Sequence, residues 1–108
     1  MQIFFWKKNK QIDAFANTIA NDLYSTIPPE IAQDYMNGPD SKTKKVNIKV
    51  ARKLDDIVLR IKQFRAENRI GVYGKARLHL KFMARLEELG YEKKVAKLFN
   101  EQTMIRTP

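Results

Sequence analysis

Cysteine is absent from the 108 residues, and this absence removes several kinds of chemistry at once. Disulfide frameworks, zinc sites with thiolate ligands, cysteine nucleophiles and thiol redox reactions are excluded. A chain without cysteine fits a reducing compartment, so we expect a cytoplasmic protein. Apolar runs of the roughly 18–20 residues that a transmembrane segment needs are also missing, and residues 1–10 lack the apolar stretch of a secretory signal.

Histidine and glycine are scarce, which leaves little from which to build an active site. The single histidine, His79, lies between two leucines, where a hydrogen-bonded structural role is more common than a role as a general base. The carboxylate pairs at 55–56 and 87–88 are adjacent, so their side chains diverge by about 100° on a helix and form no catalytic dyad. Gly71 and Gly74 do not follow a phosphate-loop pattern. We expect no catalysis, no metal site and no cofactor.

Apolar residues are plentiful enough for a core, at 44% of the chain, and 31% of the residues are charged. This balance is typical of a globular protein, and the length allows one domain of the usual size, about 100–200 residues. We expect a single helical domain over residues 1–108. Within it, residues 1–10 form an aromatic and basic segment, and residues 103–108 form a frayed tail.

The spacing of apolar residues predicts helices along most of the chain. Steps of three and four residues predict a helix over 12–27, which Pro28 and Pro29 end. A short helix follows from Pro29. The longest helix is expected over 41–68, although residues 46–50 also alternate with the two-residue period of a strand.

The segment after the long helix predicts a compact connection and two further helices. Residues 68–74 contain Gly71 and Gly74, either of which suits a left-handed helix stop, and we expect Ile70, Val72 and Tyr73 to fold back on the core. A helix over 75–89 carries apolar residues over a broad arc, which predicts burial on several sides. Gly90 suits its C-terminal cap, and a short last helix follows.

These elements predict an all-α fold, a small bundle or orthogonal array of four to five helices. We expect the long helix over 41–68 to be the central element and to pack against the helix over 75–89. No internal repeat or low-complexity tract suggests another architecture.

The net charge of +9 is unevenly distributed along the chain. Residues 1–40 carry three cations and five acids, whereas residues 41–108 carry 18 cations and seven acids. An excess of this sign favours an anionic partner such as the phosphate backbone of a nucleic acid.

Two files of cations could border one groove if the two main helices are antiparallel neighbours. Within each file most cations stand three or four residues apart, so they lie on one side of a helix and repel one another. This repulsion favours an anionic counterpart. The candidate anion-binding residues are Lys45, Lys49, Arg52, Lys53, Arg60, Lys75, Arg77, Lys81 and Arg85. The alternative is that these faces are solvated or neutralised within the fold by Asp55, Glu87, Glu88 and acids of the first 40 residues. A helix-turn-helix over 75–101 is disfavoured because the apolar residues of its second helix are needed inside.

The start of the chain suggests a different interaction. Candidate membrane-surface or protein-interaction residues there are Phe4, Phe5, Trp6, Lys7 and Lys8, because aromatic rings beside lysines suit an acidic membrane interface. The more common alternative is that the rings pack over an open end of the bundle.

The sequence therefore predicts a non-catalytic binding module for an anionic partner, with nucleic acid as the first candidate. A protein-interaction or assembly subunit, including a homodimer that uses exposed residues such as Tyr73, is the first competing hypothesis. A peripheral membrane protein is the second.

Overall fold

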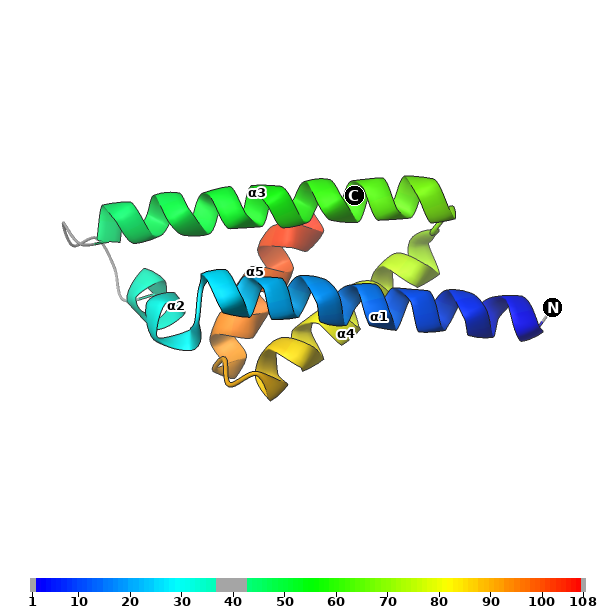
Figure 1. Cartoon of the computed structure of the whole chain (residues 1–108), viewed down its shortest axis with the longest axis horizontal. Helices are drawn as coiled ribbons and strands as arrows, with labels where there is room; N and C mark the ends of the chain where they lie inside the picture. Colours follow the sequence, from blue (N-terminus) through cyan, green and yellow to red (C-terminus); the bar gives the residue numbers. More distant parts are fainter. Residues whose placement is uncertain (1, 37–42, 108) are drawn as a thin grey trace.

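The computed structural model describes residues 2–36 and 43–107, and it describes side chains for residues 7–33 and 47–107. Over these ranges the chain forms five α-helices and no strand, which confirms the predicted all-α class. The helices are α1 (Gln2–Thr26), α2 (Pro29–Met36), α3 (Thr43–Asn68), α4 (Val72–Glu88) and α5 (Lys93–Arg106). They form an elongated body of 54 × 24 × 19 Å (Figure 1).

The first three helices lie where the sequence pattern predicts them, with two differences: α1 starts earlier, and residues 46–50 are helical rather than a strand. Because no proline or glycine precedes residue 12, the first helix extends back to Gln2 and includes residues 2–11, which lie before its predicted start. Pro28 follows its end and α2 starts at Pro29, as predicted. The strand alternative for residues 46–50 is wrong, since α3 includes them, with Val50 buried and Ile48 54% exposed.

Two left-handed residues end the long helices, and one of them is not a glycine. After α3, Arg69 has a φ of 53°, and the N–H of Ile70 donates to the carbonyl of Arg65 at 2.9 Å. This pattern is a Schellman motif built on arginine, so the prediction of Gly71 or Gly74 at this position is wrong. After α4, Gly90 has a φ of 104° and serves as the predicted cap.

Because the chain already turns at Arg69, α4 begins at Val72, three residues before the predicted start. Ile70 folds back on the core as predicted. Val72 and Tyr73 do not, since they are 84% and 66% exposed on the first turn of α4. Broad burial of α4 is also wrong, because Leu78, Phe82 and Leu86 face the core whereas Leu80 is 67% exposed.

The last helix is longer than its apolar pattern predicted. It continues to Arg106, and the expected fraying after Gln102 is wrong because Thr103 and Thr107 are buried. The Thr107 hydroxyl donates to the Thr103 carbonyl at 2.7 Å, and Arg65 of α3 donates to the Thr107 carbonyl at 3.1 Å. Polar contacts hold this end of the chain against the fold.

Pairs of contacts define the directions in which the helices run. Phe15 of α1 stacks on Phe64 of α3 at 4.1 Å, and α1 and α3 run antiparallel. By contrast, α4 lies beside α1 and runs parallel to it, since contacts from Asp13 to Arg77 and from Asn21 to Arg85 advance together along both helices. Small buried residues of α1, Ala16 and Ala20, share a face with Ile12 and allow α4 to approach closely.

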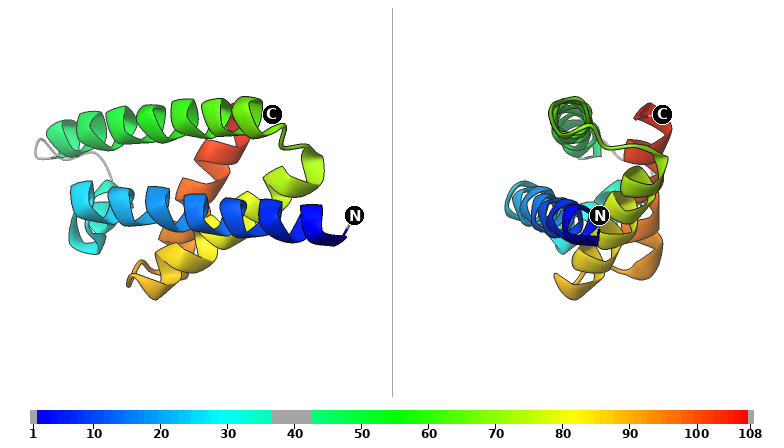
Figure 2. Two further views of the ribbon diagram at one scale, coloured as in Figure 1. Left: turned by 45° about the vertical axis from the view of Figure 1, so that its right-hand side comes forward. Right: turned by 90° about the vertical axis from the view of Figure 1, so that its right-hand side faces the viewer.

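Helix α5 lies between α3 and α4, and this placement overturns the prediction that α3 packs against α4. Seen along the molecule, α1 and α3 form one layer and α4 and α5 form the other (Figure 2). The main neighbours of α4 are α1 and α5, and those of α3 are α2 and α5. The core between these layers includes Ile19, Leu23, Ile57, Ile61, Phe82 and Phe99.

Candidate anion-binding site

The predicted cations in the middle of α3 point toward α1 and are paired there. Lys53 Nζ lies 2.5 Å from Asp22 Oδ2, and Arg60 Nη1 lies 2.6 Å from the same oxygen. Asp56 adds a carboxylate 3.4 Å from Lys53. The hydrogen bond from Lys53 is the largest influence that holds the pKa of Asp22 below its usual value, and the charge of Arg60 adds to it. These cations join α3 to α1.

The predicted cations of α4 are paired in a similar way. Arg77 donates from Nε and Nη2 to the two carboxylate oxygens of Asp13, at 2.9 Å each. This hydrogen bonding raises the pKa of Arg77 further above its usual value. Arg85 donates to Asn21 Oδ1 and to Glu88 Oε2, both at 3.1 Å. Two predicted anion-binding arginines therefore bind groups of the protein itself.

The other predicted residues do not gather at one place. Lys49 and Arg52 are exposed on the outer face of α3, and Lys81 is half-buried on α4; for these three, the described part of the chain provides no ion pair. Lys75 lies on the first turns of α4, half-buried. Outside the described side chains lie Lys45, Phe4, Phe5 and Trp6, whereas Lys7 is exposed and Lys8 is half-buried.

A single groove between two cation files does not exist among the residues that the structure describes. The files were expected to face each other across α3 and α4, but α5 fills that space. Lys53 and Arg60 are directed to the other side, toward Asp22. The arrangement agrees with the alternative in which acids of the first 40 residues neutralise cations of the later helices.

An excess of positive charge is instead found at one end of the molecule, where α1 begins, α3 ends and α4 begins. We call residues 7–13 and 62–77 the basic end. It contains eight of the 21 lysines and arginines but only two of the 12 acids, Asp13 and Glu67, and Asp13 is paired with Arg77. The rest of the chain has 13 cations and ten acids. Most of the net charge therefore resides at this end.

Five cations of the basic end form no ion pair within the ranges that the structure describes. They are Lys7, Lys8, Lys62, Arg69 and Lys75. Lys8 Nζ donates to the backbone carbonyl of Arg69 at 3.3 Å, which brings together two segments that are 61 residues apart in sequence. This contact leaves the charge of Lys8 without a counter-ion.

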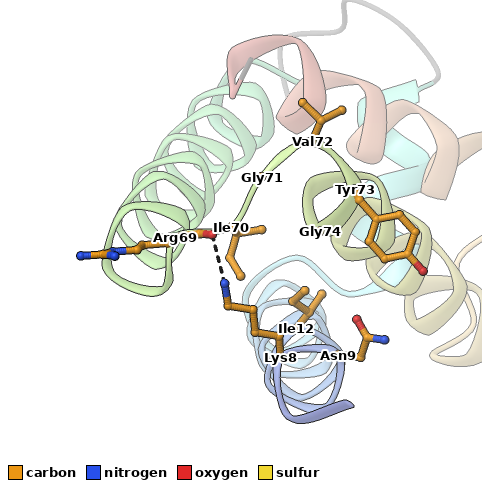
Figure 3. A pocket seen from close by; sticks show the side chains of 9 residues that line it. All are labelled: Lys8, Asn9, Ile12, Arg69, Ile70, Gly71, Val72, Tyr73 and Gly74. Carbon is orange, nitrogen blue, oxygen red and sulfur yellow. Dashed lines mark hydrogen bonds between the residues drawn. The ribbon is translucent and has the colours of Figure 1, made fainter. Parts of the chain in front are cut away.

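A cavity of about 250 Å³ opens between the basic residues (Figure 3). One wall comes from α1, with Lys8, Asn9 and Ile12, and the other is the connection and the first turn of α4, residues 69–74. Most of the lining is apolar. In Figure 3 the Asn9 amide and the Tyr73 ring lie at one side of the opening, and the Arg69 side chain points outward at the other.

Only part of this end could be predicted from the sequence. Lys75 was predicted as an anion-binding residue, and Lys7 and Lys8 as membrane-surface or interaction residues. Lys62, Arg69 and Asn9 were missed, because no local pattern joins residue 8 to residue 69. The regional charge count was the available signal: residues 62–77 alone contain five cations and one acid. Only the antiparallel packing of α1 and α3 adds Lys7 and Lys8 to them.

The buried polar residues form a separate cluster, in which His79 has the predicted structural environment. Its Nδ1 lies 3.1 Å from Asn100 Oδ1, which can only accept, so Nδ1 carries the proton. Burial is the main influence that lowers the pKa of His79, and the charges of Lys75 and Arg65 lower it further. Among the side chains that the structure describes, those of residues 7–33 and 47–107, no group of three metal-ligating side chains occurs.

Comparison with known proteins provides no functional assignment. No helix within the described residues combines the length and the apolar character that crossing a membrane requires. No protein-family model, curated protein or solved structure matches the chain. The geometry of the small helical domain is therefore the basis for a functional argument.

Proposed function

We propose that the protein is a non-catalytic binding module that holds an anionic partner at its basic end, with the phosphates of a nucleic acid as the first candidate. One observation carries the proposal: eight cations and two acids meet there, and five cations have no ion pair among the described residues. When unneutralised cations on three neighbouring segments contact phosphates, the counterions condensed on the nucleic acid are released. This release drives binding.

The proposal differs from the sequence hypothesis in where the partner binds. Lys53, Arg60 and Arg77 are engaged by Asp22 and Asp13, so using them for a ligand would break contacts between helices. Lys7 and Lys62 are exposed and involve no such loss. The basic end is therefore the less costly place to bind an anion.

The test compares two double charge reversals that give the same net charge. Lys7→Glu with Lys62→Glu alters the basic end, and Lys49→Glu with Arg52→Glu alters the outer face of α3 as a matched control. We expect the first variant to bind a labelled single-stranded DNA at least about tenfold more weakly in fluorescence anisotropy, and the second to lose much less. About five phosphate contacts predict that wild-type affinity falls roughly 100-fold between about 50 and 200 mM salt.

Two results would contradict the proposal. Equal losses in the two variants would show that only overall charge matters. Absence of binding by the wild-type protein at low salt would remove the function altogether. Circular dichroism of both variants checks that the helices are intact.

Self-assembly is a second candidate function, favoured by the outer side of α4. Tyr73 and Leu80 lie on this side and are 66% and 67% exposed, and large apolar side chains on one exposed helix face suit a protein–protein interface. Light scattering at increasing protein concentration tests it. A monomer at all concentrations, or a dimer unaffected by Leu80→Lys, would exclude this surface as the interface.

A further inference from the structure

The cavity at the basic end has a size and a lining that restrict what can enter it. Its volume of about 250 Å³ lies just below the range of about 300–1,000 Å³ that is typical of sites for drug-sized ligands. A single ring system fits such a space better than a long chain does. The apolar walls, Ile12 and Ile70 with the stem of Lys8, suit the faces of a ring.

Glycine makes part of the wall flat. Gly74 is buried against Ile70 and Ile12, and a Cβ atom built on it would lie 2.5 Å from Ile70 Cγ2, so no side chain can project there. Gly71 has no heavy atom within 4 Å of the position of a Cβ. The backbone at Gly71 is therefore accessible to a flat ligand that approaches closely, whereas Gly74 lets Ile70 pack against the backbone and form the apolar wall.

Polar groups are few and lie at the rim. The Asn9 amide offers a donor and an acceptor on the same side as the Tyr73 ring, which is 66% exposed (Figure 3). Lys8 and Arg69 place positive charge at the opposite side. An apolar slot with an exposed aromatic ring, an amide and flanking cations matches the needs of a nucleobase between two phosphates.

We propose that this cavity takes one unpaired nucleobase of a single-stranded nucleic acid, while the cations of the basic end contact the neighbouring phosphates. The inference rests on the proposed function and narrows it to single strands. In a duplex each base is stacked and paired, so its faces cannot enter a cavity unless it is first flipped out. A base edge provides hydrogen-bonding partners for the Asn9 amide, which a purely aliphatic occupant does not.

The experiment compares two labelled probes of equal length and charge. One is oligothymidylate, and the other is the same sugar-phosphate chain without bases. Because stacking on an aromatic side chain contributes about 5- to 150-fold per base, we expect the base-bearing probe to bind at least about fivefold more tightly. A duplex of the same length should bind no better than the abasic probe.

Two variants connect the preference to the cavity. Tyr73→Leu removes the ring at an exposed position, and Asn9→Ala removes the amide; each should reduce the preference for bases while leaving affinity for the abasic probe unchanged. Tyr24→Leu, at a 40% exposed tyrosine near the opposite end of α1, is the matched control and should keep the preference.

The outcomes separate this inference from the proposed function. Equal affinity for both probes, still reduced by Lys7→Glu with Lys62→Glu, would overturn the base site and support the phosphate site. Binding of neither probe would remove both. Tyr73-dependent binding to vesicles of acidic lipid, without a preference for bases, would overturn the inference in favour of a lipid occupant.

Discussion

At the scale of single residues, His79 shows how burial determines the role of an ionisable group. It is 1% exposed, Asn100 accepts from its Nδ1, and Thr107 Oγ1 lies 3.5 Å from its Nε2. The Thr107 hydroxyl already donates to Thr103, so the neutral imidazole has one hydrogen bond, and among the described residues no acid stabilises its charged form. The cations Lys75 and Arg65 face it instead.

This environment predicts a pH dependence of stability with a definite sign. Because burial lowers the pKa of His79 in the folded state, the unfolded chain takes up the proton first as the pH falls below about 6.5. The free energy of unfolding should therefore decrease from pH 7 to pH 5. His79 is the only histidine, so His79→Gln should show a nearly flat profile over this interval in urea titrations, even though it is less stable at pH 7. The same slope in the variant and the wild type would contradict this explanation.

Arg69 is the other residue whose environment is unusual, because its φ of 53° is disfavoured for any side chain. Arg69→Gly relieves this strain, and we expect it to raise the free energy of unfolding by about 0.5–1 kcal/mol. Arg69→Ala removes the same charge but keeps a Cβ atom, so it should give no such gain. Thermal melts of the two variants measure the difference. A gain shared by both would assign the effect to charge rather than to the backbone.

At the scale of helices, ion pairs between elements contribute to the pairing of helices. Apolar residues define the buried face of each helix, but they do not determine which helix that face contacts. Asp22 binds cations of α3, and Asp13 binds Arg77 of α4, so two acids of α1 connect it to both neighbours. From the sequence such neutralisation is one of two alternatives, since a row of cations along a helix does not reveal where its counter-ions lie.

Asp22 provides the test at this scale. Asp22→Asn leaves Lys53, whose side chain is 13% exposed, and Arg60 with only the more distant carboxylate of Asp56, at 3.4 and 3.9 Å. We expect a loss of about 1–2 kcal/mol in the free energy of unfolding at pH 7, reduced from the value for a fully buried pair because Asp22 is 35% exposed. Asp55→Asn is the control, because Asp55 pairs only with the exposed Arg106 among described residues and should lose less.

The Asp22 variant also changes the response to acid. The folded-state pKa of Asp22 lies below its ordinary value of 3.8, so its stabilising contribution is complete above that value and is lost as the pH falls further. The variant should therefore lose less stability than the wild type below about pH 4. Parallel acid titrations would contradict the assigned role of Lys53.

At the scale of the whole molecule, the distribution of charge in the folded protein differs from its distribution along the sequence. The sequence separates an acidic first part from a basic remainder, yet the fold brings Lys7 and Lys8 of the acidic part to the end of α3. Acids of the same part neutralise the middle of α3 and α4. Folding thus gathers the excess at one end, beside the cavity.

The number, type and order of the helices follow from the sequence, because periodic apolar residues, Pro28 with Pro29, and Gly90 act locally. Packing partners, the position of α5 and the neighbours of each cation come only from the tertiary structure. A helix turns its side chains in all directions, and contacts such as Lys8 with Arg69 join residues that no local spacing relates. The basic end and its cavity exist only once α1, α3 and α4 have packed.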